Sequence, residues 1–185
     1  MRTCLLVIDV QESFRYRPYF SARDVPAYLQ AQNALVTGAL SRGIPIVRVF
    51  HVERNPDSPF SVESGNVRPL EGLTDFDAAT TVHKSRHSAL IGSGLDVWLN
   101  QNGIDDVIVS GIRTEQCCET TTRHASDLGY RVHFVTDATL TFDMRHADGS
   151  LFEASEIKRR TQTVLVNRFA TVCSVEQALE AANPH

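Results

Sequence analysis

Apolar runs of the kind that form buried strands recur along the chain. Residues Cys4–Ile8 and Val107–Val109 are continuously apolar, and Ile46–Phe50 and Val132–Val135 each contain one polar residue. A strand that is buried on both faces of a sheet has such a run, whereas a strand with one solvated face alternates between apolar and polar residues. We therefore expect four central strands of a parallel sheet.

Segments with a helical spacing of apolar residues separate these runs. They span Tyr28–Leu40, Leu90–Leu99 and Glu115–Gly129, and a late helix is predicted over Leu151–Val166, before one more strand at Ala170–Cys173. Helices that alternate with buried strands indicate right-handed βαβ crossovers. The pattern predicts an α/β fold, a doubly wound and mostly parallel sheet with helices on both faces.

Composition and charge narrow the class of protein. The 185 residues, 42% of them apolar and 22% charged, suit one compact core, and we expect residues 1–185 to form a single domain. The formal net charge is -4 and no basic block is present, so we expect no nucleic-acid partner. The first apolar run, Cys4–Ile8, is too short for a signal peptide or a membrane span. We therefore expect a cytoplasmic protein that binds a small molecule and no membrane.

The cysteines indicate reactive chemistry at one turn. Positions 4, 117, 118 and 173 lack the spacing of a zinc site or of a disulfide framework. Cys117 and Cys118 follow the strand Val107–Val109 and begin the third predicted helix. The start of a helix offers free backbone N–H groups and a positive dipole end, which stabilise a thiolate and an adjacent oxyanion. A nucleophile is one interpretation of this turn, and a small buried thiol is the other.

Two charged residues also follow predicted strands. Asp9 comes directly after Cys4–Ile8, and Lys84 ends the short strand-like piece Thr81–Lys84. Ligands of open α/β sheets bind outside the carboxyl ends of the strands, so we expect Asp9, Lys84 and Cys117 to meet there. Asp9 would exchange the thiol proton with the leaving nitrogen of an amide, and Lys84 would supply fixed positive charge. A cap role for Asp9 and a solvated surface position for Lys84 are the alternatives.

A further carboxylate lies close to the predicted nucleophile. Glu115 is two residues before Cys117. A carboxylate at this distance raises the pKa of a thiol unless its side chain points to solvent. We therefore expect Glu115 to point outward.

Three motifs follow one another along nearly the whole sequence. They are Asp9-Val-Gln-Glu-Ser-Phe14, Lys84-Ser-Arg-His-Ser-Ala-Leu90-Ile-Gly-Ser93 and Gly111-Ile-Arg-Thr-Glu-Gln-Cys117. In combination they resemble the isochorismatase-like cysteine hydrolases, a family that includes nicotinamidase, N-carbamoylsarcosine amidase and ureidoacrylate amidase. The resemblance implies a Rossmann-like three-layer α/β sandwich, a homodimer or homotetramer, and a catalytic triad of Asp9, Lys84 and Cys117 in which Cys117 rather than Cys118 is the nucleophile.

The resemblance also implies residues around the triad. It implies a cis peptide bond before Arg113, and an oxyanion hole formed by the backbone N–H groups of Arg113 and Cys117. Phe14 matches an aromatic residue that the family places over the substrate. Leu90 stands where many members have Phe and is expected to contact substrate, with a plain core role as the alternative.

Further binding residues and the absence of a cofactor follow from the same comparison of motifs. Gln11 and Thr114 are expected to support the site by hydrogen bonds, with local turn or cap bonding as the alternative. Nicotinamidases carry a metal-binding Asp-x-His after the second strand, whereas Val49 takes the Asp position before His51 here. We therefore expect no metal and no other cofactor. His51 is expected to line the pocket or to hydrogen-bond the neighbouring loop.

We predict a cysteine hydrolase that cleaves a C–N bond of a small amide, ureido or carbamoyl compound. Isochorismatases proper cleave a vinyl ether and can do so without the cysteine, so the presence of Cys117 favours C–N hydrolysis. A vinyl-ether hydrolase, a redox-sensing dithiol at Cys117 and Cys118, and a binding protein with an unused site are the alternatives. We expect the irregular segment Arg54–Leu73, or a neighbouring subunit, to close the pocket and decide its size.

Overall fold

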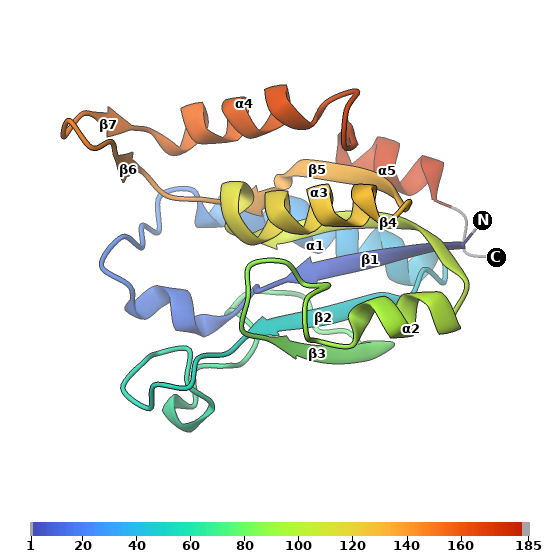
Figure 1. Cartoon of the computed structure of the whole chain (residues 1–185), viewed down its shortest axis with the longest axis horizontal. Helices are drawn as coiled ribbons and strands as arrows, with labels where there is room; N and C mark the ends of the chain where they lie inside the picture. Colours follow the sequence, from blue (N-terminus) through green and yellow to red (C-terminus); the bar gives the residue numbers. More distant parts are fainter. Residues whose placement is uncertain (1, 183–185) are drawn as a thin grey trace.

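The centre of the molecule is a parallel β-sheet (Figure 1), in a computed structural model that describes residues 2–182. Its six strands lie in the order β3-β2-β1-β4-β5-β8, and all neighbours pair in parallel. Each predicted strand is confirmed. The bounds are β1 Arg2–Ile8, β2 Ile46–His51, β3 Thr80–Lys84, β4 Ile104–Ile112, β5 Arg131–Leu140 and β8 Thr171–Cys173.

Helices cover both faces of the sheet (Figure 1). On one face lie α1 (Val25–Ser41) and α5 (Val175–Ala181). On the other lie α2 (Leu95–Gln101), α3 (Glu119–Asp127) and α4 (Ala154–Leu165). The predicted doubly wound sheet in a three-layer α/β sandwich is therefore confirmed. Shorter elements are the 3₁₀ turns η1 (Glu12–Tyr16) and η2 (Val62–Ser64), and an antiparallel hairpin of β6 (Met144–Arg145) and β7 (Leu151–Phe152).

Two predicted helices begin later than the sequence pattern indicates. The helix predicted from Leu90 begins at Leu95, because Gly92 and Gly94 have φ angles of 67° and 77°. These angles lie in the left-handed region, which a right-handed helix excludes. Leu90 therefore lies in a turn before α2.

The late helix, predicted over Leu151–Val166, begins at Ala154. The two residues at its predicted start, Leu151 and Phe152, form β7 instead. Glu153 then caps the helix, and its own backbone N–H donates to the carboxylate of Glu156 at 2.9 Å. Such a reciprocal capping box fixes the first residue of a helix more strongly than apolar spacing does.

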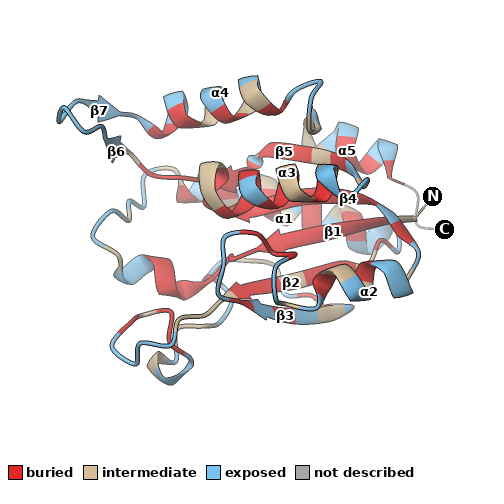
Figure 2. Ribbon diagram, in the orientation of Figure 1, coloured by how far each residue is buried: buried red, intermediate tan, exposed pale blue. Residues whose placement is uncertain are grey.

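Apolar layers on both faces of the sheet explain the continuous runs in the sequence. Leu5 and Val7 of β1 pack toward α1 and α5, whereas Leu6 and Ile8 pack toward α2, α3 and α4. Both faces of this strand are therefore buried, as the coloring of Figure 2 shows for β1. A central strand with two apolar faces has no polar alternation.

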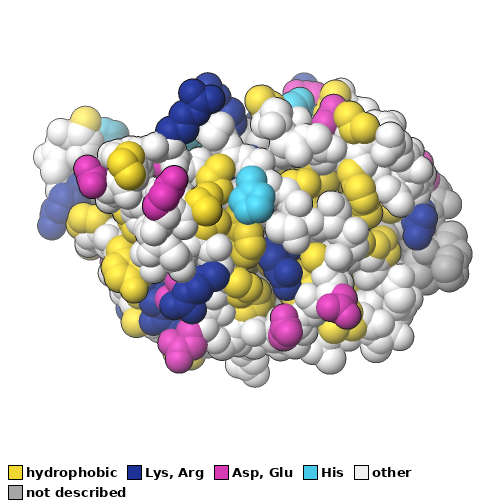
Figure 3. Space-filling view, turned by 90° about the horizontal axis from the view of Figure 1, so that it is seen from below, with side chains coloured by type: hydrophobic (Ala, Val, Ile, Leu, Met, Phe, Trp, Pro, Cys, Tyr) yellow, Lys and Arg dark blue, Asp and Glu magenta, His cyan; other side chains and the backbone are white. Residues whose placement is uncertain are grey.

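The surface carries charges of both signs. Basic and acidic side chains are interspersed over the face drawn in Figure 3, in a chain whose formal net charge is -4. Among residues 2–182, no helix combines the length and the apolar character needed to span a bilayer.

Candidate active site

The structure brings Asp9, Lys84 and Cys117 together at the carboxyl edge of the sheet. Asp9 directly follows β1, Lys84 is the last residue of β3, and Cys117 lies in η3 (Thr114–Cys118), a π-helical turn between β4 and α3. The Nζ atom of Lys84 lies 2.7 Å from Oδ2 of Asp9 and 3.3 Å from Sγ of Cys117. One ammonium group therefore contacts both the carboxylate and the thiol.

A tight fit between β1 and β4 positions this edge. Asp9 has a φ of 54°, in the left-handed region that few residues other than Gly, Asn and Asp adopt. Gly111 lies opposite Ile8 in the register of the two strands, and a Cβ atom added to Gly111 would collide with the backbone of Ile8. The glycine therefore lets the strands approach and places Asp9 beside the turn that holds Cys117.

Lys84 uses all of its hydrogen-bond donors inside the site. An ammonium group has three N–H donors, and these meet Asp9, Cys117 and, at 3.3 Å, Nδ1 of His51. Burial lowers the pKa of Lys84, but the charge of Asp9 and the hydrogen bonds to Asp9 and Cys117 outweigh burial, so the net pKa shift is upward. Burial and the charge of Lys84 lower the pKa of His51. The imidazole is therefore neutral, accepts at Nδ1 and carries its proton on Nε2.

The thiol of Cys117 is protonated in this arrangement. Burial raises its pKa, the Asp9 carboxylate raises it further, and Lys84 lowers it by less. The position at a helix start predicted a stabilised thiolate, and the structure differs because Cys117 is only 7% exposed and faces a carboxylate. Within residues 2–182, Oδ1 of Asp9 is buried and has no hydrogen-bond partner. Asp9 therefore has an oxygen free to accept a proton.

Glu115 does not point to solvent, so that prediction was wrong. Its side chain is 11% exposed, lies 3.0 Å from the guanidinium of Arg113, and accepts a hydrogen bond from Thr141 at 2.6 Å. The guanidinium also lies over the ring of Tyr19, 4.6 Å from its centroid. Arg113 thus balances the charge of Glu115 beside the site. A cis peptide bond joins Ile112 to Arg113, as the resemblance implied.

Three predicted binding residues lie behind the site. The Gln11 side-chain amide donates to the carbonyl of His51 at 3.1 Å and accepts from its N–H at 2.8 Å. The Thr114 hydroxyl donates to Oγ1 of Thr139 at 2.8 Å. Leu90 is 5% exposed and packs in the apolar layer beneath α2 and α3. Gln11 therefore holds the end of β2 that carries His51, and Thr114 ties η3 to β5.

A cavity of about 180 Å³ opens over the thiol. Four predicted residues line it, namely Asp9, Phe14, His51 and Cys117. The remaining lining residues, which the sequence analysis did not single out, are Arg17, Tyr19, Glu53, Phe60, His87 and Gln116.

Some of these missed residues had a signal in the sequence. Glu53 and His87 lie two and three residues beyond the ends of β2 and β3, so the strand-end rule that indicated Asp9 also covers them. Arg17 and Tyr19 had no such signal, because they follow η1 in a segment without periodic spacing.

Known proteins are similar to this chain in sequence over most of its length. The family model of the isochorismatase domain matches residues 3–177. The chain belongs to the isochorismatase family. The uncharacterized isochorismatase family protein YrdC from Bacillus subtilis is 26% identical over 96% of this chain and 95% of its own length. Nicotinamidase 3 from Arabidopsis thaliana is 34% identical over 75% of this chain and 73% of its own length.

A solved structure of an isochorismatase-family protein has the same fold as this chain. A protein from Chromobacterium violaceum, described as a hydrolase of the isochorismatase family, superposes with a TM-score of 0.89 at 28% identity. The superposition covers 97% of this chain and 93% of that chain. Members of the isochorismatase family are hydrolases, and this chain is therefore an isochorismatase-family hydrolase.

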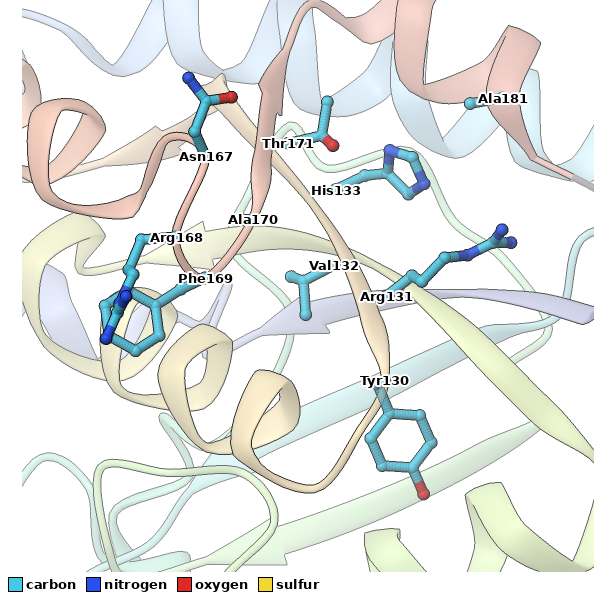
Figure 4. A pocket seen from close by; sticks show the side chains of 10 residues that line it. All are labelled: Tyr130, Arg131, Val132, His133, Asn167, Arg168, Phe169, Ala170, Thr171 and Ala181. Carbon is cyan, nitrogen blue, oxygen red and sulfur yellow. The ribbon is translucent and has the colours of Figure 1, made fainter.

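Larger cavities of this isochorismatase-family hydrolase lie away from the thiol. One of about 530 Å³ lies at the amino ends of β5 and β8 (Figure 4), and one of about 580 Å³ lies between α1 and the start of α4. Neither is lined by Asp9, Lys84 or Cys117. Within residues 2–182, no three His, Cys, Asp or Glu side chains converge so that they could hold a metal ion. The reactive groups, rather than the volume, identify the candidate site.

His133, in the cavity of Figure 4, binds a buried carboxylate and makes stability depend on pH. Its Nε2 lies 3.1 Å from Oδ1 of Asp106, and interactions with Asp106 and Cys173 raise the pKa of His133 to about 9. A raised pKa in the folded state stabilises the fold below the ordinary histidine pKa of about 6.5. This contribution is lost as the pH rises through about 9.

We therefore predict that the free energy of unfolding falls by about 2 kcal/mol between pH 6.5 and pH 9. The variant His133→Gln is expected to remove most of this dependence. Urea unfolding at a series of pH values measures it. An equally steep dependence in the variant would contradict the role of His133.

Proposed function

We propose that this isochorismatase-family hydrolase cleaves a C–N bond of a small amide, ureido or carbamoyl compound through a thioester on Cys117. The observation that carries the proposal is the contact of Lys84 with both Asp9 and Cys117 beneath the cavity. A thiol beside a proton acceptor and a fixed positive charge is suited to attack on a carbonyl carbon. Relatives named nicotinamidase and streptothricin hydrolase also support the proposal.

The first half of the reaction forms the thioester. Asp9 accepts the thiol proton as Sγ of Cys117 attacks the carbonyl carbon. The carbonyl oxygen becomes an oxyanion, and we assign its stabilisation to the backbone N–H groups of Arg113 and Cys117. Asp9 then returns the proton to the nitrogen, the C–N bond breaks, and ammonia or an amine leaves.

The second half of the reaction hydrolyses the thioester. Water attacks the acyl carbon while Asp9 accepts a proton from it, and the thiolate of Cys117 leaves and is protonated again. The product is a carboxylic or carbamic acid. Lys84 stays protonated throughout and reduces the repulsion between the thiolate and the Asp9 carboxylate. The raised pKa of the thiol fits a nucleophile that ionises only when Asp9 accepts its proton.

The alternatives are less well supported by the packing. Cys117 and Cys118 are both free thiols, but Cys118 is fully buried in the apolar layer while Cys117 lines the cavity. A disulfide between these neighbours would need Cys118 to leave its packing, which disfavours a dithiol sensor. A vinyl-ether hydrolase has no need of the thiol that Lys84 contacts.

Two expectations about the surroundings of the site remain proposals. A homodimer or homotetramer is the assembly that the family resemblance implies. The segment Arg54–Leu73 contributes Phe60 to the cavity lining, which supports its role in closing the pocket.

Trapping an acyl-enzyme tests the proposed reaction. The enzyme is mixed with a panel of small amides, ureides and carbamoyl compounds, and each reaction is quenched in acid. The masses of the protein and its peptides are then measured by mass spectrometry. We expect a mass gain equal to the acyl group on the peptide that contains Cys117, with release of ammonia or an amine. The variant Cys118→Ser is the matched control and should keep the adduct. Hydrolysis that continues without a thiol at position 117 would refute the proposal.

A further inference from the structure

We propose that the substrate of this site carries a carboxylate and that Arg17 binds it. The inference rests on the proposed amide hydrolysis and names the class of its substrate. Arg17 follows η1 and lines the cavity over Cys117. It forms an ion pair with Glu53, which lines the same cavity.

Glu53 orients the guanidinium of Arg17 and is not available to bind a substrate itself. Its Oε1 accepts from Nη2 of Arg17 at 3.0 Å, and its Oε2 accepts from the hydroxyl of Ser58 at 2.6 Å. The protonated Nε2 of His51 lies 3.8 Å from Oε1. Each oxygen of Glu53 therefore already faces a donor of the protein. A positively charged substrate would have to displace these partners.

The guanidinium of Arg17 has N–H donors that no acceptor among residues 2–182 occupies. A guanidinium carries five N–H donors, and among residues 2–182 its only hydrogen-bond acceptor is Glu53. The Cζ atom of Arg17 lies over the ring of Phe60, 4.9 Å from the centroid, and Glu53 is bound through Nη2, so further N–H groups remain for a ligand. Two parallel N–H groups of a guanidinium match the two oxygens of a carboxylate. Glu53 and Phe60 thus hold a carboxylate receptor in place before substrate arrives.

The volume of the cavity limits the rest of the substrate. An apolar cavity of about 150 Å³ holds benzene, whereas sites for drug-sized ligands measure about 300–1,000 Å³. The cavity here measures about 180 Å³. A substrate that places its carbonyl at Cys117 and its carboxylate at Arg17 therefore has roughly six to ten non-hydrogen atoms. Short amido acids, such as succinamate, belong to this class.

Matched substrates test the role of Arg17. Succinamate and succinamide have the same number of non-hydrogen atoms and differ in one charged group. We expect kcat/KM to be at least about tenfold higher for succinamate, because hydrogen bonds to a charged group each contribute about 1.5–3 kcal/mol. Arg17→Met is expected to lower kcat/KM for succinamate about 10- to 100-fold, mainly through KM, and to change succinamide less than about threefold.

Two further variants control for other effects of the substitution. Arg17→Lys keeps the charge but loses the planar pair of donors, so it should restore only part of the preference. Arg42→Met removes an exposed arginine at the end of α1 and should leave both substrates unaffected. Equal losses on both substrates in Arg17→Met would overturn the inference, because they would indicate a structural role.

Binding measurements separate this inference from the proposed hydrolysis. Calorimetric titration of Cys117→Ser with malonamate, succinamate and glutaramate requires no turnover. Binding that Arg17→Met abolishes, without any hydrolysis by the native enzyme, would support the carboxylate receptor and refute the amidase. Hydrolysis of neutral amides, without binding of any of these three acids, would support the amidase and refute the receptor.

Discussion

Asp9→Asn is expected to lower the turnover of amide substrates by about 10³- to 10⁴-fold and to make the Cys117 thiol more reactive toward alkylation. The two effects have opposite signs because the carboxylate has two roles. It raises the pKa of the thiol. In the reaction that we propose, it also accepts the proton that must reach the leaving nitrogen. The amide of Asn lacks both the charge and the basicity, so the thiol ionises more easily while no group returns its proton.

The pH dependence of alkylation separates these roles. The rate at which iodoacetamide modifies Cys117 reports the pKa of the thiol, and ammonia release reports turnover. We expect a lower thiol pKa in Asp9→Asn than in the native enzyme. Asp57→Asn, at an exposed position in the segment Arg54–Leu73, is the control and should change neither quantity. A thiol pKa that stays the same or rises would contradict the contribution of the Asp9 charge.

Lys84→Met is expected to reduce the free energy of unfolding by about 3–5 kcal/mol as well as to abolish hydrolysis. The side chains of Lys84 and Asp9 are both 0% exposed. Removal of the ammonium leaves the carboxylate buried without its counter-charge, and it leaves His51 and Cys117 without the donor they share. A buried charge that loses its partner retains the full cost of its removal from water.

A double variant tests whether this loss comes from the unpaired charge. Asp9→Asn combined with Lys84→Met should recover most of the stability, because removing both partners of a buried pair costs less than removing one. Hydrolysis should stay absent. Lys158→Met is the matched control, since Lys158 is the other lysine of the chain and donates to the carbonyl of Thr136 at 3.3 Å. Urea unfolding should show a loss below about 1 kcal/mol for this control. A similar small loss in Lys84→Met would contradict the prediction.

Much of the fold could be predicted from the sequence because the strands are buried on both faces. The continuous run Cys4–Ile8 has no other common interpretation at that length, and the structure confirms it as part of β1. Helix starts were less predictable. The conformations of Gly92 and Gly94, and the pairing of Leu151 with β6, depend on tertiary packing that apolar spacing does not report.

The charged part of the site was predictable because polar residues end strands, whereas Phe14 was predicted through the family resemblance alone. Asp9 and Lys84 interrupt or end such runs, and the structure brings them to Cys117. Phe60 could not be placed in this way, because its edge-to-face contact with Phe14, at 5.0 Å between centroids, joins an irregular segment to the short turn η1. The predicted outward orientation of Glu115 was wrong for a related reason. A partner two residues away, Arg113, holds it inside, and no spacing rule indicates that pair.

The strand order also determines when the Cys117 thiol acquires its raised pKa during folding. β1 pairs with β4, which lies about a hundred residues further along the chain, so Asp9 reaches Cys117 only after this non-local pairing. Until then the thiol has the ordinary acidity of an unfolded chain and ionises more readily than in the native enzyme. The newly made chain, rather than the finished hydrolase, is therefore the form in which Cys117 is most open to oxidative damage.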